Sequence, residues 1–241
     1  MRILIFLFLC SEFLYGQVSK IEYERKLDWT KIVQSMTFMS KEEKDRMAIT
    51  WGKRSSDPVY YSLLVDSVQS IYQIDEEKLT TQDFSWRREK RIIHTNYRNK
   101  RKLDNIEILG KAFVFDEDLP KIKWKIMNEI KEVAGYVCMK AVTTDTIKNQ
   151  VVVAWFTSEI PISIGPDNYY GLPGLILEIS KNDGSALITA TEVSLKNINK
   201  PILIPKKKGK KITTEKMNAL ILKHIKESMA AQRNPYWSLE Y

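Results

Sequence analysis

The sequence predicts an α+β fold that is mainly β: a large curved antiparallel sheet, of which a half-barrel is one form, with one early and one C-terminal helix packed on it. Three observations lead to this expectation. About nine short strand-like segments follow one another at close spacing. Helical signals occur only near the two ends of the chain. Two of the strands are apolar on both faces, which a flat sheet with one solvated face would not require.

The first 16 of the 241 residues have the three-part layout of a secretory signal peptide. A basic residue starts it, an apolar run of seven residues follows at 3–9, and the small residue Gly16 precedes Gln17. The run is far too short to cross a bilayer, which needs roughly 20 residues; a buried N-terminal strand is the alternative. We therefore expect cleavage after Gly16 and a single soluble domain at 17–241. This domain should lack a transmembrane segment and be periplasmic or secreted.

Turn residues divide the chain into the strands of the sheet. Alternating apolar and polar residues predict the first strand at 18–27. The other predicted strands lie at 59–66, 68–74, 91–97, 106–115, 124–127, 134–144, 151–157, 175–181 and 186–196. Predicted turns lie at 116–120, 145–149 and 182–185. In the last of these, Asp183-Gly184 is a good hairpin signal.

Two helices are predicted. Ser40 and Glu43 form a capping box, which places one helix at 40–51, directly before Gly52. The pattern at 214–232 predicts the other helix, with an apolar stripe formed by Met217, Leu220, Ile221, His224, Ile225 and Met229.

Residues 151–156 and 175–177 are the segments that are apolar on both faces, so we expect these strands to be covered on both sides. A strongly curved sheet with helices or an apolar cavity in its concave side explains this coverage. We expect an apolar concavity lined partly by Trp155 or Phe156 and capped by a helix.

The chain is poor in the residues from which most catalytic and metal sites are built. It has two histidines, His94 and His224, and removal of the signal peptide leaves Cys138 as its one cysteine. Zinc and copper sites usually gather several such ligands, and the sequence contains no HExxH, GxSxG, CxxC or phosphate-loop motif. We therefore expect no catalytic residue, no metal and no cofactor. A packed, inert Cys138 is the simpler interpretation, and a nucleophilic Cys138 is the alternative.

Residues 165–174 read GPDNYYGLPG and predict a tight loop before the strand at 175–181. The two prolines fix φ and remove amide donors, and a strand rather than a helix follows, so a nucleotide-binding loop is not expected. A rigid corner that presents Tyr169 and Tyr170 is one interpretation. A ligand-binding lip formed by the two tyrosines is the other.

Several motifs around this loop occur together. Residues 171–176 spell GLPGLI, and upstream of them lie GYVCMKA at 135–141, AWFT at 154–157, Ile160-Pro161 and Gly165-Pro166. In the identity, order and spacing of these motifs the chain resembles the GLPGLI family, secreted proteins of Gram-negative bacteria. The resemblance implies an exported envelope protein without a settled activity, and it assigns no functional residue.

Positive charge is concentrated in two segments of a chain whose formal charge is +8. Residues 86–102 hold eight basic residues and one acidic residue, and residues 200–211 hold six basic residues and no acidic residue. A solvated strand edge and a solvated loop are the plain interpretation. Contact with an anionic envelope component is the functional one, because export argues against a nucleic-acid partner.

These patterns favour a non-enzymatic exported protein that binds an apolar or amphiphilic ligand or an outer-membrane partner. The candidate ligand-binding residues are Tyr169, Tyr170, Trp155 and Phe156. The alternatives are an adaptor acting through 86–102 and 200–211, and an enzyme using Cys138. An outer-membrane protein, a lipid or another anionic envelope component is the expected partner.

Overall fold

The computed structural model describes residues 18–51, 58–78, 91–196, 198, 200–239 and 241. The predicted signal peptide lies outside the described residues, as do Gly52 and residues 86–90 of the first basic segment. The helices are α1 (Trp29–Gln34), α2 (Lys41–Trp51) and α3 (Thr214–Ala230), with the short 3-10 helices η1 (Glu76–Lys78) and η3 (Pro235–Trp237). The strands are β1 (Ser19–Leu27), β2 (Val59–Val65), β3 (Gln69–Ile74), β4 (Arg91–Asn96), β5 (Arg101–Ile108), β6 (Lys111–Asp118), β7 (Lys125–Val133), β8 (Tyr136–Asp145), β9 (Gln150–Thr157), β10 (Leu175–Lys181), β11 (Ala186–Ser194) and β12 (Lys210–Lys211).

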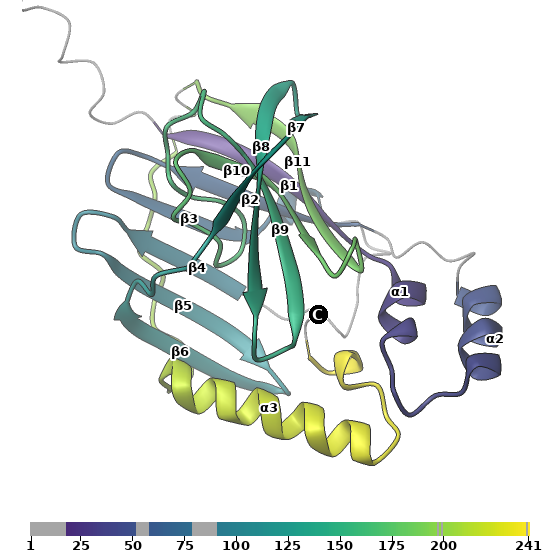
Figure 1. Ribbon diagram of the computed structural model, residues 1–241. Coiled ribbons are helices and arrows are strands. Elements are labelled where there is room, and N and C mark those ends of the chain that lie inside the picture. Colours follow the sequence, from purple (N-terminus) through teal and green to yellow (C-terminus); the bar gives the residue numbers. More distant parts are fainter. Residues whose placement is uncertain (1–17, 52–57, 79–90, 197, 199, 240) are drawn as a thin grey trace, which may run out of the picture.

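All of these strands belong to one sheet of 12 strands, in the order β12-β6-β5-β4-β3-β2-β1-β11-β10-β9-β8-β7. Every pair of neighbours is antiparallel except β12 and β6, whose short pairing is parallel. The sheet is strongly curved and its two ends do not meet (Figure 1). The predicted mainly β fold with a curved sheet is therefore confirmed, although the sheet has more strands than expected.

Several elements form where local signals predict them. The capping box at the start of α2 is present: the Ser40 amide donates to Glu43 Oε2 (2.8 Å) and the Glu43 amide donates to Ser40 Oγ (3.2 Å). β10 has the predicted bounds. The turn between β10 and β11 contains Asp183 and Gly184 with φ of 54° and 83°, as the hairpin signal indicates.

The predicted strand at 106–115 is wrong because the chain reverses in its middle. Leu109 and Gly110 have φ of 51° and 71° and form a two-residue turn between β5 and β6. The predicted turn at 116–120 is also wrong in part, since β6 continues to Asp118. Arg101 of β5 forms ion pairs with Asp116 and Asp118, which offsets the charge of the acidic residues in this strand.

Two further differences concern β7 and α1. β7 extends well beyond the predicted 124–127, and the turn before β8 is made by Ala134 and Gly135, both with positive φ. α1 has only six residues, too few to show a helical stripe, so the sequence pattern does not predict it. Its N-cap Asp28 accepts a hydrogen bond from the amide of Lys31 (3.1 Å).

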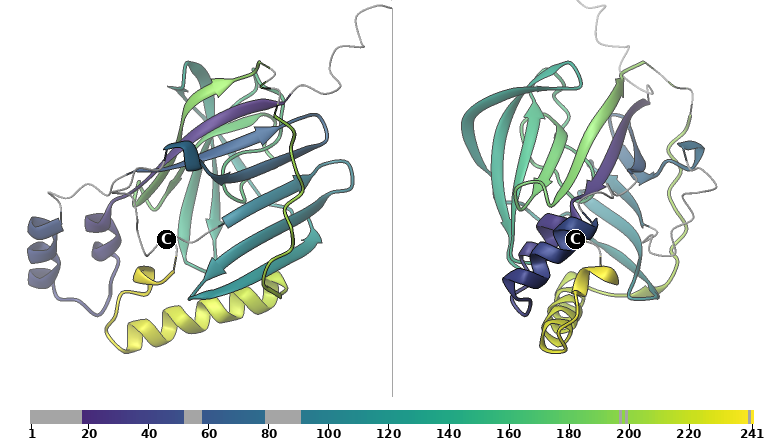
Figure 2. Two further views of the ribbon diagram at one scale, coloured as in Figure 1. Left: turned by 180° about the vertical axis from the view of Figure 1, so that it is seen from behind. Right: turned by 90° about the vertical axis from the view of Figure 1, so that its right-hand side faces the viewer.

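The main core lies between the two halves of the curved sheet, on its inner face (Figure 2). Residues 158–174 enter this space and bring Ile160, Ile164 and Leu172 into the core that contains Phe156. The expected concavity beside Trp155 and Phe156 is therefore occupied by the chain's own loop rather than capped by a helix.

The expected coverage of two strands on both faces is confirmed for one of them. In β10, Leu175, Ile176 and Leu177 are each 0% exposed. The expectation is wrong for β9, where Val151 is 50% exposed because the outer side of this strand lies at the surface.

α3 covers the inner face of β5 and β6 at one end of the sheet (Figure 1). Met217 of the predicted stripe is buried there against Phe113 and Phe115, and Leu220, Ile221 and Ile225 pack against the same cluster. In the described part of the chain, no helix combines the length and the apolar character needed to span a membrane.

The outer face of β2–β6 carries a different layer. Residues 200–208, which we call the strap, run across these strands between β11 and β12, as the yellow-green segment in the left view of Figure 2 shows. Ile202 of the strap is 8% exposed and packs against Val18, Leu64 and Ile71. This second small core holds the strap on the sheet.

Candidate functional site

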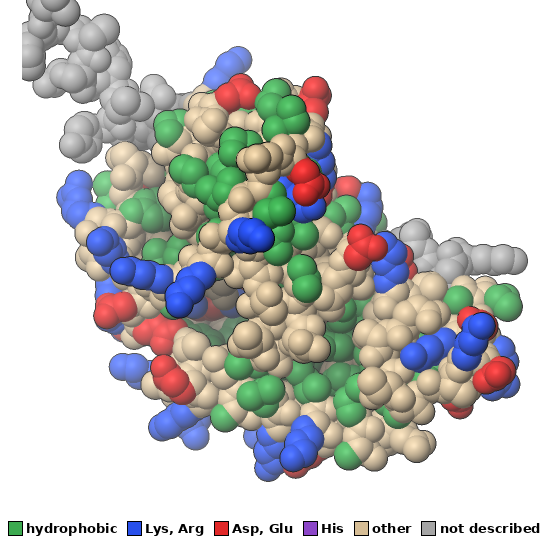
Figure 3. All heavy atoms as spheres, in the orientation of Figure 1, with side chains coloured by type: hydrophobic (Ala, Val, Ile, Leu, Met, Phe, Trp, Pro, Cys, Tyr) green, Lys and Arg blue, Asp and Glu red, His purple; other side chains and the backbone are tan. Residues whose placement is uncertain are grey.

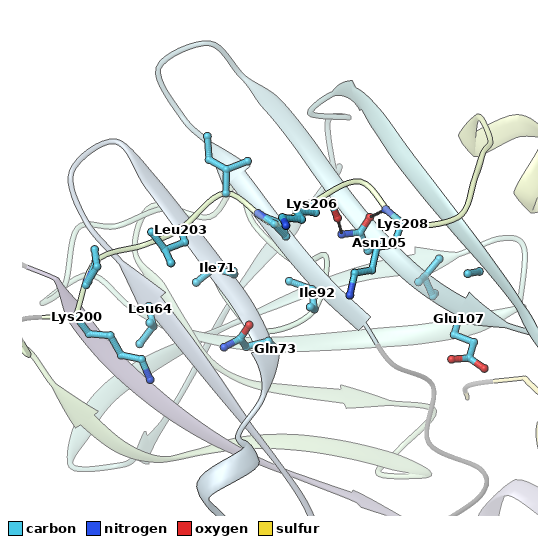
Figure 4. Close-up of a pocket in the computed structure, with 15 residues that line it drawn as sticks. Leu64, Ile71, Gln73, Ile92, Asn105, Glu107, Lys200, Leu203, Lys206 and Lys208 are labelled. Carbon is cyan, nitrogen blue, oxygen red and sulfur yellow. Dashed lines mark hydrogen bonds between the residues drawn. The ribbon is translucent and has the colours of Figure 1, made fainter.

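A groove of about 520 Å³ lies between the strap and the outer face of β2–β6 (Figure 4). Its volume is within the range of roughly 300–1,000 Å³ that small-molecule sites occupy. Nine of its fifteen lining residues are apolar. The lining residues are Leu64, Ile71, Gln73, Ile92, Asn105, Ile106, Glu107, Ala112, Lys200, Pro201, Leu203, Ile204, Pro205, Lys206 and Lys208.

The floor of the groove follows from the pairing of the strands. Leu64 of β2 is paired with Ile71 of β3, and Ile92 of β4 is paired with Gln73 of β3 and Asn105 of β5. Paired residues point to the same face of a sheet, so these side chains form one continuous surface. The floor is therefore mainly apolar over β2–β4, with Gln73 as its one polar side chain there, and is polar again at Asn105.

Asn105 fixes the strap over this floor. Its side-chain amide donates to the carbonyl of Lys206 (2.9 Å) and its side-chain oxygen accepts from the amide of Lys208 (3.1 Å). The Asn105 side chain thus donates one hydrogen bond to the strap backbone and accepts one from it, as a backbone peptide group of a neighbouring strand would. Pro201 and Pro205 have no amide N–H, so the strap lies over the sheet without joining it as a strand.

The strap presents both apolar and basic groups. Leu203 and Ile204 are 71% and 66% exposed, and all six lysines of 200–211 are exposed. Lys207 pairs with Asp116 and, together with Arg101, lowers the pKa of that carboxyl to about 2. The groove therefore combines an apolar floor with a basic rim, a composition suited to holding a ligand.

In its described part, the first basic segment is divided between the exposed Arg98 and Lys100 at the turn after β4 and residues held in ion pairs. Arg91 and Lys102 point to the inner face and are largely buried, and Arg101 pairs with Asp116 and Asp118. Along the left side of Figure 3, where Figure 1 places β4–β6, positive and negative side chains lie next to one another.

The buried charges of this segment belong to a cluster beneath the loop at 165–174. Arg91 pairs with Asp104 (2.6 Å) and with Asp167 (2.6 Å), while Lys102 lies 3.9 Å from Asp104 and Lys181 lies 3.9 Å from Asp167. Burial acts to raise the pKa of Asp167, but Arg91 and Lys181 outweigh it and lower this pKa to about 2. The cluster attaches the loop to β4, β5 and β10 by charge pairing.

The GLPGLI string itself packs into the core. Leu172 is 1% exposed and Ile176 is 0% exposed. Gly174 has a φ of 156°, and a Cβ there would lie 2.7 Å from the carbonyl carbon of Thr157, so another side chain would push the loop away from β9. These contacts support the interpretation of the loop as a rigid corner.

The four candidate ligand-binding residues do not line the groove. Tyr169 packs near Trp124, with ring centroids 6.2 Å apart, and the hydroxyl of Tyr170 donates to the carbonyl of Pro120. Trp155 lies under the amine of Lys131, 4.7 Å from the ring centroid, and Phe156 is 1% exposed. Phe156, Trp155 and Tyr169 thus belong to the main core, and all four residues lie apart from the strap.

Cys138 and the two histidines lie in three different surroundings. Cys138 is 0% exposed, and burial raises the pKa of its thiol to about 11. His94 Nε2 lies 2.8 Å from Gln69 Oε1, and His224 Nε2 lies 3.1 Å from the carbonyl oxygen of Pro235. Within the described residues, no group of three or more His, Cys, Asp and Glu side chains is arranged to hold a metal ion.

Sequence reasoning identified the lysines of the strap but missed the groove under them. The available signal is the segment PILIP at 201–205, an apolar run between prolines and directly before KKK. Such a run can leave its apolar side chains over a neighbouring surface, since prolines keep it out of a regular strand. The floor gives no such signal, because it is assembled from five strands.

Comparisons with known proteins give one local family match and a similarity in fold. A family described as "Protein of unknown function (Porph_ging)" matches residues 143–178, a region that runs from β8 into β10 and includes the GLPGLI string. A search of the curated proteins gave no match.

Among solved structures, the chain is similar to PNGF-II. The structure of PNGF-II in space group P21 is 18% identical over 84% of this chain, with a TM-score of 0.56. The structure in space group C2 is 16% identical over 86% of this chain, with a TM-score of 0.52. The match covers 33% of PNGF-II in both cases, so this chain spans about a third of that protein. At these identities the likeness shows a shared fold, and residues 143–178 show a local similarity to a family of unknown function.

Proposed function

We propose that this protein is an exported envelope protein of the GLPGLI type that binds an apolar or amphiphilic ligand without catalysing a reaction, and that the groove under the strap is its binding site. The observation that carries the proposal is an apolar groove of about 520 Å³ roofed by a segment with two exposed apolar side chains. Large exposed apolar side chains that lie beside a concave apolar surface are typical of binding sites.

The way in which the strap is attached supports a site where a ligand lies between the strap and the sheet. Ile202, Asn105 and β12 hold the strap at three places, while Leu203 and Ile204 between the first two remain exposed. A ligand on the floor of the groove would give these two side chains an apolar surface to cover. Burial of such side chains stabilises a complex by about 25 cal/mol for each Å² removed from water.

The test is binding of N-phenyl-1-naphthylamine, an uncharged probe whose fluorescence rises in apolar sites. We expect the full chain to bind the probe and the double variant Leu203→Ser, Ile204→Ser to bind it about tenfold more weakly. The variant loses apolar contact with the probe worth about 1.4 kcal/mol, which corresponds to a factor of ten in affinity. Both side chains are exposed, so the substitutions leave the core intact.

The matched control is Ile49→Ser on α2, because Ile49 is 72% exposed and Leu203 is 71% exposed. This control should bind the probe as the original chain does. An original chain that does not bind the probe, or a strap variant with unchanged affinity, would contradict the assignment of the groove.

The second candidate is an adaptor that binds an acidic envelope protein through the strap. The observation that favours it is the row of six exposed lysines at 200–211. The Leu203→Ser, Ile204→Ser variant separates the two functions, because it retains all six lysines. An electrostatic adaptor would keep its partner in this variant, whereas the groove would lose its ligand.

A further inference from the structure

The rim of the groove holds more positive than negative charge. Lys200, Lys206 and Lys208 line the groove together with a single carboxylate, that of Glu107. Lys200 lies 4.0 Å from Glu77 outside the groove. Among the described residues, neither the Lys206 amine nor the Lys208 amine has an ion-pair partner, so both are available to an anion.

The three consecutive lysines of the strap have different neighbours. In an extended chain, side chains alternate between two sides, so Lys206 and Lys208 share a side and Lys207 points away from it. Lys207 pairs with Asp116 on β6, whereas Lys206 and Lys208 line the groove. Figure 4 shows the Lys208 side chain extending from the strap towards Ile92 on the floor. The pairing of Lys207 and the two hydrogen bonds of Asn105 hold the other two lysines over the groove.

The backbone groups around the groove favour an acyl chain over a peptide. The floor is the face of a sheet whose strands β2–β6 already pair with neighbours on both sides, and the roof contains two prolines without amide N–H. Of the two amide side chains of the floor, Asn105 is already bonded to the strap, and Gln73 lies beside Ile92. A peptide would bury unpaired N–H and C=O groups here, which is costly, whereas an acyl chain has none.

We propose that the ligand of this groove is a single-chain amphiphile with an anionic head group, whose chain lies on the floor beneath residues 203–205 and whose head group is bound by Lys206 and Lys208. This inference rests on the proposed function and adds the chemical class of the ligand. A carboxylate and a phosphate head group share the required charge, and hydrogen bonds from ammonium groups to either are charge-assisted.

The test compares three ligands of equal chain length: decanoate, 1-decanol and decyltrimethylammonium. Each displaces N-phenyl-1-naphthylamine from the full chain at low ionic strength, where rim charges are weakly screened. We expect decanoate to bind about tenfold more tightly than decanol, because a hydrogen bond to a charged group strengthens binding by about a factor of ten. Decyltrimethylammonium should bind more weakly than decanol. Decyl phosphate, tested alongside, distinguishes a carboxylate preference from a general preference for anions.

The double variant Lys206→Gln, Lys208→Gln should lose the preference for decanoate while keeping its affinity for decanol. The control Lys210→Gln, Lys211→Gln removes the same charge from β12, outside the groove, and should keep the preference. Equal binding of all three ligands would overturn the head-group assignment and leave the apolar groove standing. Failure of all three to bind would overturn the proposed function itself. A preference that survives in the Lys206, Lys208 variant would place the anion site elsewhere and overturn the inference.

Discussion

At the scale of single residues, Cys138 and Asp167 have perturbed pKa values that come from burial and from neighbouring cations. Cys138 has no exposed surface, and Asp167 is surrounded by the cations that bind its loop to the sheet. Perturbed pKa values often accompany catalytic sites. Here the pKa of Cys138 is shifted by burial and that of Asp167 by ion pairs, and both causes also stabilise folded proteins. Each shift leads to a testable prediction.

Cys138 should be inert in the folded protein. A thiol reacts as its thiolate, and burial raises the pKa of Cys138 to about 11, so the thiolate is scarce at neutral pH. In a Cys10→Ser chain, where Cys138 is the sole thiol, we expect no reaction with Ellman's reagent at pH 8 until denaturant is added. Rapid labelling of the native protein would instead support the alternative of an enzyme that uses this thiol.

Asp167 should make stability depend on pH. Its folded-state pKa of about 2 lies below the value of about 3.9 for an unfolded Asp, so the stabilising contribution is complete above pH ~4 and is lost as the pH falls through about 2. We expect Asp167→Asn to lower the free energy of unfolding by about 2 kcal/mol at pH 7 and by about half of that at pH 3, as urea unfolding would measure.

Asp183→Asn is the matched control for this change. Asp183 also has a positive φ, 54° against 56° for Asp167, but it is exposed in a hairpin turn. Asparagine tolerates this backbone conformation, so the control should change stability by less than about 0.5 kcal/mol at either pH. A deficit for Asp167→Asn that does not shrink on acidification would exclude its charge as the cause.

At the scale of elements, the strap and β12 depend on a close approach of two backbones. Gly209 has a φ of 106°, and a Cβ there would lie 2.5 Å from the carbonyl carbon of Ala112 and 2.7 Å from the amide nitrogen of Phe113. This contact between the end of the strap and β6 leaves no room for a side chain.

Gly209→Ala should therefore detach β12 and loosen the strap. We expect the free energy of unfolding to fall by about 1–3 kcal/mol, the usual cost of a strained backbone site, and trypsin to cleave within residues 206–211 several times faster. Gly110→Ala is the control, since Gly110 also has a positive φ (71°) but has open space around it. It should destabilise the hairpin without accelerating cleavage of the strap; equal cleavage of the two variants would contradict the role of the close contact.

At the scale of the whole molecule, the two faces of one sheet have different roles. The inner face is packed by the loop at 158–174, the ionic cluster and α3. The outer face of β2–β6 is covered by the strap alone over the groove, which leaves the space beneath it. The groove that we propose as the binding site therefore lies on the outer face, opposite to the concavity that the apolar strands suggest.

Local patterns predicted most of the elements and few of their relations. β1, β10, α2 and α3 carry their signals within a few adjacent residues, in alternation, a capping box or a stripe, and they form where expected. The hairpin at Leu109-Gly110 was missed because Leu is not a typical turn residue at positive φ. Phe156 was expected beside a cavity, but it packs against residues 158–174. These residues follow Phe156 in the sequence, and only the tertiary structure shows that they fold back onto it.

The sequence by itself determined the fold class, the motif-bearing loop and the basic character of residues 200–211, because each depends on neighbouring residues along the chain. The tertiary structure decided where the charges and the apolar surface meet. It buries Arg91 and Lys102 of one basic segment in ion pairs and places Lys206 and Lys208 of the other over an apolar floor. The physical reason is that the floor is made of side chains from five strands, which only strand register and the curvature of the sheet bring under the strap.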